Sequence, residues 1–373
     1  DWTFGPTLAV PQDDRWGRAY EGYAENPEVA QSYAGPMTLG LQGTLSADHP
    51  LTAGHIAGSA KHFLADGGTT GGKDQGDYAG SEQEMIRTHL SGYPQAIDAG
   101  VLSIMASFSS WNGVKHSGNE TILTDVLRGP LGFDGFVVSD WNAHGQLPGC
   151  SNESCALAFN AGIDMFMAPD SWKPLYASTL AQVKSGEIPM ARLDEAVRRI
   201  LRVKVKTGLF NDSRPVEGHI NELGSPAHRA LAREAVRKSL VLLKNEGSVL
   251  PIRSGARVLV AGHADDIGQA SGGWTLTWQG TGNTNADFPN GQSIWSGIRE
   301  AVAAGGGQAT LSADGSFTQK PDVAIVVFGE TPYAEFQGDV EHLDFVPEEP
   351  LETLRALQAQ GIVRPIHDGK RSV

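Results

Sequence analysis

The chain has 373 residues, of which 40% are hydrophobic and 19% are charged, and this composition is typical of a globular protein and excludes a disordered one. Its length favours two domains. The formal net charge of −14 argues against binding to nucleic acid or to anionic membranes. No run approaches ~18 consecutive apolar residues, so we also expect no membrane insertion.

The first part of the chain, residues 1–212, alternates short apolar strands with helical patterns. The expected strands are residues 2–10, 55–64, 101–107, 135–139 and 162–167, and the expected helices are residues 83–99, 119–128, 172–185 and 191–207. Strand–helix alternation predicts a parallel sheet, and its repetition predicts a (β/α)8-type barrel. A complete barrel takes ~250 residues, so we expect this barrel to be N-terminally incomplete.

A polar stretch, residues 213–227, predicts a linker to a second domain, residues 228–373. The pattern there predicts a helix at 228–244, strands at 257–261 and 322–328, and a helix at 348–360. This is typical of an α/β sandwich. The helical pattern is followed by a polar, basic stretch where a strand is expected, so we expect the second domain to be C-terminally incomplete.

The segment Phe136 to Trp141 carries the clearest chemical signal. Its apolar β-branched run predicts a buried strand that ends at Ser139-Asp140-Trp141. A carboxylate at the end of a parallel strand, with an indole beside it, is how a sugar-cleaving barrel presents a nucleophile and a stacking platform. The alternative is an aspartate that caps the following turn.

The only two cysteines, Cys150 and Cys155, lie in one loop and are separated by four residues. That spacing can close a small disulfide ring, which would indicate an oxidising compartment, the periplasm or the exterior. Two reduced, buried thiols are the alternative. None of the nearby His or acidic residues has a metal-ligand spacing, so we expect no metal and no cofactor.

Several short motifs, taken together and in order, resemble glycoside hydrolase family 3, the exo-acting β-glucosidases and β-glucan exohydrolases. They are Arg15-Trp16-Gly17-Arg18-Ala19-Tyr20-Glu21, Lys61-His62-Phe63, Asp66-Gly67-Gly68-Thr69, Ser109-Ser110-Trp111-Asn112-Gly113, Ser139-Asp140-Trp141, Ala161-Gly162-Ile163-Asp164-Met165, residues 272–280 and residues 329–335. The resemblance implies a barrel plus an α/β sandwich and a retaining, two-step displacement. Retention needs two carboxyl groups, one ionised to attack and one protonated to release the leaving group.

The resemblance makes Asp140 the nucleophile and a glutamate of the second domain the acid/base. Glu335, in the pattern Pro-Tyr-x-Glu, is the first choice for this acid. Glu330, which follows a predicted strand directly, is the alternative acid. Both glutamates could instead simply face solvent.

Six further residues are expected to bind the sugar: Arg18, Lys61, His62, Asp66, Trp141 and Trp278. A long cation and an imidazole at a strand end can donate hydrogen bonds to hydroxyls, and two indoles can stack on the apolar faces of a glucosyl ring. The alternatives are a barrel-floor salt bridge for Lys61, a core histidine for His62, a turn residue for Asp66 and core positions for the tryptophans. Gln75 stands where many glucan exohydrolases carry an acidic residue.

The resulting prediction is an enzyme, a β-glucosidase-like O-glycosyl hydrolase that releases glucose from the nonreducing end of β-glucosides or β-glucan oligosaccharides. We expect it to be periplasmic or secreted. The alternative is a truncated, non-catalytic fragment of such an enzyme. Weaker alternatives are a β-N-acetylglucosaminidase, which would need a histidine absent after Phe63, a β-xylosidase, and a metal hydrolase using His55, His62 and Asp140.

Overall fold

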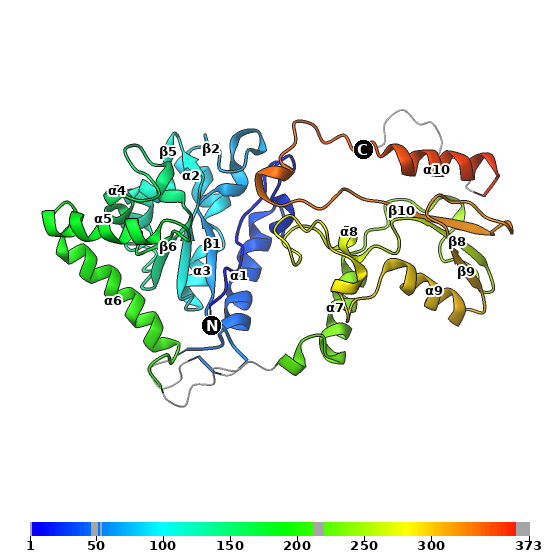
Figure 1. Ribbon diagram of the computed structural model, residues 1–373, viewed down its shortest axis with the longest axis horizontal. Coiled ribbons are helices and arrows are strands. Elements are labelled where there is room, and N and C mark those ends of the chain that lie inside the picture. The colour runs from blue at the N-terminus through cyan, green and yellow to red at the C-terminus, as the bar shows by residue number, and fades with distance from the viewer. Residues whose placement is uncertain (1, 46–50, 53, 212–219, 363–373) are drawn as a thin grey trace. The chain divides into compact units, whose positions relative to one another are not determined.

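The computed structural model describes residues 2–45, 51–52, 54–211 and 220–362 (Figure 1). It divides into two compact units. Unit 1 is Asp1–His219 together with Glu335–Leu343, and unit 2 is Ile220–Ala334 together with Asp344–Val373. The first part of the predicted linker, residues 213–219, lies outside the described residues. Glu335 falls in the span predicted for the second domain, yet the structure groups it with unit 1.

Unit 1 is built on a parallel four-stranded sheet in the order β1-β3-β6-β7. The strands are β1 (Ser59–Phe63), β3 (Ser103–Ala106), β6 (Phe136–Trp141) and β7 (Met165–Met167). The predicted strand at residues 2–10 is present only as two parallel bridges, Trp2 to Ala57 and Thr7 to Lys61. Pro6 lies between them and has no N–H to donate to a continuous ladder.

A second, small sheet joins the loops that follow β1 and β3. Its order is β2-β4-β5, with β2 (Asp77–Tyr78) parallel to β4 (Ser110–Trp111) and β4 antiparallel to β5 (Val114–Lys115). The Asp77 carboxylate accepts hydrogen bonds from the Ser110 hydroxyl, at 2.7 Å, and from the Gly113 amide, at 2.8 Å. These contacts fix the loops at the carboxyl ends of the barrel strands.

Helices alternate with the strands of unit 1, as the sequence predicts. They are α1 (Pro27–Gln42), α2 (Glu82–Glu84), α3 (Tyr93–Asp98), α4 (Ala156–Ala161), α5 (Trp172–Ser185) and α6 (Met190–Lys206). The expected helix at 83–99 is broken, because a π-helical turn, Met85–His89, separates α2 from α3. Another π-helical turn, Thr121–Val126, replaces the α-helix expected at 119–128.

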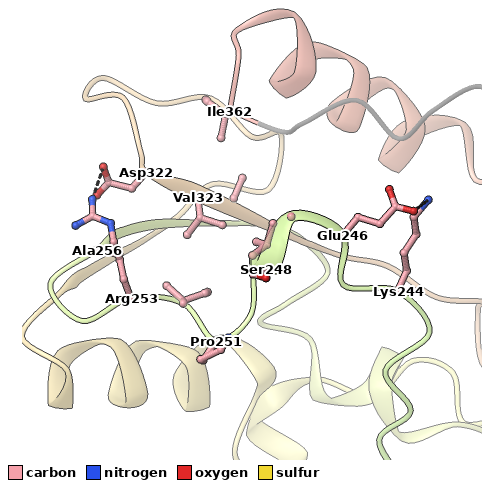
Figure 2. A pocket seen from close by; sticks show the side chains of 13 residues that line it. Lys244, Glu246, Ser248, Pro251, Arg253, Ala256, Asp322, Val323 and Ile362 are labelled. Atoms are coloured by element: carbon pink, nitrogen blue, oxygen red, sulfur yellow. Dashed lines mark ion pairs between the residues drawn. The ribbon is translucent and has the colours of Figure 1, made fainter.

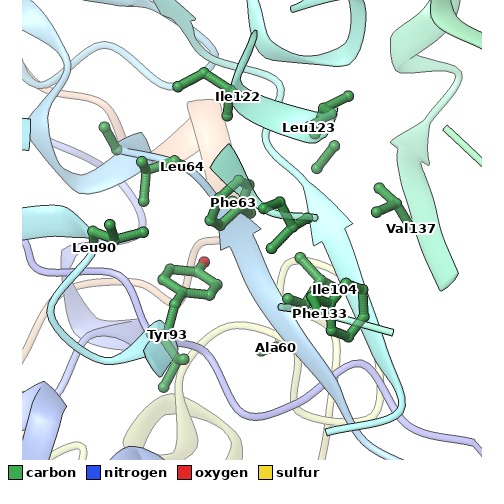
Figure 3. Packing of buried hydrophobic residues seen from close by; sticks show 14 of the residues in the cluster. Ala60, Phe63, Leu64, Leu90, Tyr93, Ile104, Ile122, Leu123, Phe133 and Val137 are labelled. Carbon is green, nitrogen blue, oxygen red and sulfur yellow. The ribbon is translucent and has the colours of Figure 1, made fainter. Parts of the chain in front are cut away.

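The core of unit 1 lies between the sheet and the helices that follow its strands (Figure 3). Phe63 and Tyr93 meet edge to face, with ring centroids 4.9 Å apart, and Ile104 is fully buried beside them. Phe63 and Ile104 each contribute roughly 1.5–3 kcal/mol, because their apolar side chains leave water on folding. A smaller cluster, which includes Phe136, Val138 and Val203, packs α6 onto β6.

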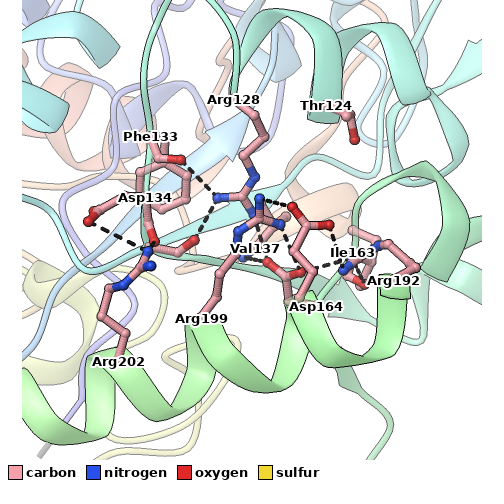
Figure 4. Close-up of polar contacts among 12 residues, drawn as sticks. Thr124, Arg128, Phe133, Asp134, Val137, Ile163, Asp164, Arg192, Arg199 and Arg202 are labelled. Carbon is pink, nitrogen blue, oxygen red and sulfur yellow. Dashed lines mark hydrogen bonds and ion pairs between the residues drawn. The ribbon is translucent and has the colours of Figure 1, made fainter. Parts of the chain in front are cut away.

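A buried ion cluster ties the helices to the sheet near the start of β7 (Figure 4). The side chain of Asp164 has no solvent exposure and accepts hydrogen bonds from Arg128 at 2.6 Å, from Arg192 at 2.8 Å and from the Val137 amide at 2.9 Å. Arg199 lies 3.5 Å from the same carboxylate. Arg192 and Arg199 come from α6, so Asp164 fixes that helix to the barrel strands.

Unit 2 is a three-stranded parallel sheet in the order β10-β8-β9, with β8 (Arg257–Gly262), β9 (Gln308–Leu311) and β10 (Val323–Val327). Its helices are α7 (Pro226–Ser239), α8 (Ile267–Ser271), α9 (Ile294–Ala304) and α10 (Glu348–Ala359). The helix expected at 228–244 ends at Ser239. The fold class is that predicted from the sequence, a barrel-type α/β unit followed by an α/β sandwich.

Unit 2 also contains an open pocket beside β10, lined in part by Ser248, Pro251 and Val323 (Figure 2). Arg253 and Asp322 form an ion pair of 3.1 Å at its edge. None of the site residues predicted from the sequence lines this pocket, so the candidate site lies elsewhere.

Candidate active site

The strand ends of β1 and β6 place the predicted nucleophile next to the predicted sugar-binding residues. Asp140 is the penultimate residue of β6 and is 9% exposed, and its Oδ1 accepts a hydrogen bond of 2.7 Å from the Trp141 amide. His62 Nε2, at the end of β1, lies 3.7 Å from Asp140 Oδ2. Trp141, the last residue of β6, is 55% exposed.

His62 is buried, and both of its ring nitrogens face protein groups. Nδ1 lies 2.7 Å from Asp66 Oδ2, and Nε2 lies 3.1 Å from Arg18 Nη2. Because a guanidinium only donates, Nε2 must accept, and Nδ1–H therefore donates to Asp66. Burial first, and then the Arg18 charge, hold the pKa of His62 well below its usual value, which agrees with this neutral tautomer. The imidazole is thus placed to orient Arg18 rather than to donate to a sugar.

Asp66 supports His62 from the loop after β1. It is 8% exposed, and its Oδ1 accepts a hydrogen bond of 3.0 Å from the Gly67 amide. Burial raises the pKa of this carboxyl to about 6, while the Arg18 charge opposes that shift. Asp66 therefore holds the imidazole in one tautomer at neutral pH.

Arg18 contacts three other side chains of the site, those of Glu21, His62 and Glu335. Its Nε and Nη2 donate to Glu21 at 2.8 and 3.0 Å, and its Nη1 lies 3.5 Å from Glu335 Oε1. Burial works to lower the pKa of Arg18, but the hydrogen bonds to Glu21 outweigh burial and raise it. Glu21 is not among the site residues predicted from the sequence, although its position three residues after Arg18 in a short helix is a signal for pairing.

Lys61 is half-buried on β1, next to His62 in the chain. Burial first, and then the Arg18 charge, lower the pKa of its ammonium, while the Glu21 and Asp140 charges act to raise it. Lys61 is therefore close enough to Asp140 for the two charges to interact.

The two candidate acids occupy different units. Glu335 begins the short helix Glu335–Gly338 within unit 1, where it meets Arg18. Glu330 belongs to unit 2 and accepts a hydrogen bond of 2.9 Å from the Tyr333 hydroxyl. Trp278 also belongs to unit 2, where it is 42% exposed and its carbonyl accepts from the Trp274 amide at 2.9 Å.

The chemistry of this site is that of carboxylates, a guanidinium and an imidazole. Within the described residues, no group of three or more His, Cys, Asp or Glu side chains could hold a metal ion. Cys150 and Cys155 are joined by a disulfide in the loop before α4. Among the helices that the structure describes, none is long and apolar enough to cross a membrane.

Comparison with known proteins finds similarity along most of the chain. The family model described as glycosyl hydrolase family 3 N terminal domain matches residues 1–203, and the corresponding C-terminal domain model matches residues 240–365. A lysosomal beta glucosidase of Dictyostelium discoideum is 33% identical, covering 94% of this chain and 46% of the relative. A periplasmic beta-glucosidase of Salmonella typhimurium is 34% identical over 84% of this chain and 40% of its own length.

Solved structures are also similar to this chain over nearly all of its length. The exo-1,3/1,4-beta-glucanase of a Pseudoalteromonas species is 51% identical, with a TM-score of 0.93, and the match covers 97% of this chain and 46% of that one. A beta-glucosidase from Listeria innocua, solved in complex with glucose, is 26% identical with a TM-score of 0.82, over 96% of this chain and 50% of its own. The chain thus spans about half the length of the relatives it matches.

Proposed function

The chain belongs to glycosyl hydrolase family 3, as the sequence motifs predict, and on that premise we propose that it is a retaining exo-glycosidase. It would release glucose from the nonreducing end of β-glucosides or β-glucan oligosaccharides. The observation that carries this proposal is that Arg18 and His62 contact each other and link Glu335 to Asp140. Arg18 lies 3.5 Å from Glu335 and 3.1 Å from His62, which in turn lies 3.7 Å from Asp140.

In the first step, an oxygen of the ionised Asp140 carboxylate attacks C1 of the sugar. The bond from C1 to the glycosidic oxygen breaks as Glu335 gives its proton to that oxygen, and a glycosyl ester on Asp140 forms. In the second step, Glu335 takes a proton from water while the water oxygen attacks C1. Glucose leaves with its β configuration, and both carboxyl groups return to their initial states.

The remaining site residues would bind the sugar or hold a fixed positive charge near the two carboxyl groups. Arg18 stays charged close to both carboxyl groups, and its position is fixed by Glu21 on one side and His62 on the other. Lys61 adds a donor on β1, and the exposed indole of Trp141 offers a flat apolar surface to the ring. Trp278 is proposed as a second stacking surface, on the strength of the family motif alone.

We propose β-linked glucosides rather than xylosides as substrates, because the relatives with the greatest coverage are beta-glucosidases and beta-glucanases. We also propose a periplasmic or secreted location. The disulfide between Cys150 and Cys155 supports an oxidising compartment, and the Salmonella relative is described as periplasmic.

The test is the stereochemistry of the first product. The chain is incubated with 4-nitrophenyl β-glucoside, and the anomeric protons are followed by NMR before mutarotation. We expect β-glucose first, and much slower release from 4-nitrophenyl β-xyloside. Initial α-glucose would contradict retention, and no release from either substrate would contradict the proposed activity.

A further inference from the structure

The segment that carries Glu335 is held on unit 1 by one acidic side chain that no sequence signal singled out. Asp339 lies four residues after Glu335, just beyond the short helix Glu335–Gly338. Its Oδ1 accepts a hydrogen bond of 2.9 Å from the Gly17 amide, and its Oδ2 accepts one of 2.8 Å from the Asp74 amide. One carboxylate thus joins this segment to two loops that are 322 and 265 residues away in sequence.

The two loops that Asp339 joins lie next to residues of the candidate site in the chain. Gly17 immediately precedes Arg18, which meets Glu335 at 3.5 Å. Asp74 follows the loop of Asp66, and its own carboxylate accepts a hydrogen bond of 3.0 Å from the Trp16 indole. Because Asp339 fixes both loops to its own segment, it fixes the distance between Glu335 and the barrel residues at the same time.

Close packing supports the same role. A side chain at Gly17 would place its Cβ 2.1 Å from the Glu335 carbonyl oxygen and 2.6 Å from the Gly338 carbonyl carbon. The backbones therefore touch at Gly17, and a backbone hydrogen bond of 3.0 Å from Val340 to the Arg15 carbonyl continues the contact. The Asp339 charge also helps to raise the pKa of Asp74, although burial raises it more. This like-charge proximity opposes the arrangement, so the two amide hydrogen bonds must outweigh it.

We propose that Asp339 is a positioning residue for the acid/base Glu335, acting through its hydrogen bonds to the Gly17 and Asp74 amides. This proposal deepens the proposed function and rests on it. Asp339 need not touch the substrate. Its loss would let the Glu335 segment move away from Arg18, and proton transfer to the leaving group would suffer while attack by Asp140 would not.

The first arm of the test compares leaving groups. In Asp339→Asn, one amide oxygen cannot replace two carboxylate oxygens, and in Asp339→Ala both acceptors are lost. We expect kcat/KM for cellobiose to fall at least ~10-fold in Asp339→Ala, within the ~10²- to 10⁴-fold that general acid catalysis contributes. 2,4-Dinitrophenyl β-glucoside, which needs little protonation, should lose less than ~3-fold. The matched control is Glu341→Gln, an exposed carboxylate two residues on, which should change neither substrate.

The second arm is independent of activity. Hydrogen exchange of the full chain should accelerate in both Asp339 variants at the Gly17 and Asp74 amides and throughout residues 335–343. Exchange in the core strand β3 should stay slow, which shows that the variants fold. Unchanged exchange at those amides would overturn the proposal, and so would an equal loss on both substrates. If the unaltered chain hydrolyses neither substrate, the proposed function fails, and the exchange arm alone decides the role of Asp339.

Discussion

Replacing Gly17 by alanine should displace the candidate acid by a distance that the structure defines. The added Cβ would lie 2.1 Å from the Glu335 carbonyl oxygen, and real Cβ atoms essentially never approach closer than 3.0 Å. The opposing atoms are backbone, so no side-chain rotation can relieve the overlap, and the segment must move by about 1 Å. A misplacement of that size can cost ~10²-fold in rate, or about 2.7 kcal/mol of transition-state stabilisation.

The assay is kcat/KM for cellobiose, with thermal unfolding measured on the same samples. The matched control is Gly40→Ala, because a Cβ at Gly40, within α1, would meet no atom within 4 Å. Alanine also favours a helix over glycine by up to ~1 kcal/mol, so this control should keep its activity and unfold no earlier. A Gly17→Ala variant with unaltered kcat/KM would refute the reasoning, since the Glu335 segment could not then be packed on Gly17.

Three further predictions concern the ion cluster, a buried histidine and the acid. Asp164→Asn should lower the free energy of unfolding by about 3–5 kcal/mol in a urea titration, because three arginines lose their buried counter-charge. Asp134→Asn, which removes an exposed partner of Arg202, should cost less than ~1 kcal/mol, and equal losses would contradict the role given to burial. Burial lowers the pKa of His116 to about 4, so the unfolded chain takes up a proton near pH 6.5 while the folded chain does not. The free energy of unfolding therefore falls by roughly 3 kcal/mol for this group as the pH falls from 6.5 to 4. In His116→Leu the plot of this free energy against pH should be flatter over that range, and parallel plots for the two proteins would contradict the prediction. Glu335→Gln should slow the hydrolysis of cellobiose by up to ~10²- to 10⁴-fold and that of 2,4-dinitrophenyl β-glucoside far less. If Glu330→Gln shows this pattern and Glu335→Gln does not, Glu330 is the general acid.

Much of the barrel could be predicted because its strands are short apolar runs that end in polar residues. The run from Phe136 to Val138 correctly predicted β6, and α5 matches its predicted range. The helix α1 gave no such signal, since Gly35, Pro36 and Gly40 interrupt its pattern. It forms nevertheless, because Asn26 caps its first turn through the Glu28 amide and four of its residues are buried.

The site could be predicted as a set of residues but not as a connected network. Asp140, His62 and Arg18 lie in short motifs, and the motifs do bring them together. The grouping of Glu335 with unit 1 depends on contacts such as that from Gly17 to Asp339, which join residues 322 positions apart. Local patterns contain no information about such contacts. The tautomer of His62 likewise follows only from the positions of Arg18 and Asp66 around it.

The most direct test of the account is to trap the glycosyl ester. The chain is incubated with 2,4-dinitrophenyl 2-deoxy-2-fluoro-β-glucoside, whose fluorine slows both steps and whose leaving group restores the first. Intact mass followed by peptide mapping then locates any adduct. We predict one fluoroglucosyl group, attached to Asp140. An adduct on a different carboxylate would contradict the assignment of the nucleophile, and an unlabelled chain that nevertheless hydrolyses β-glucosides would contradict the two-step mechanism.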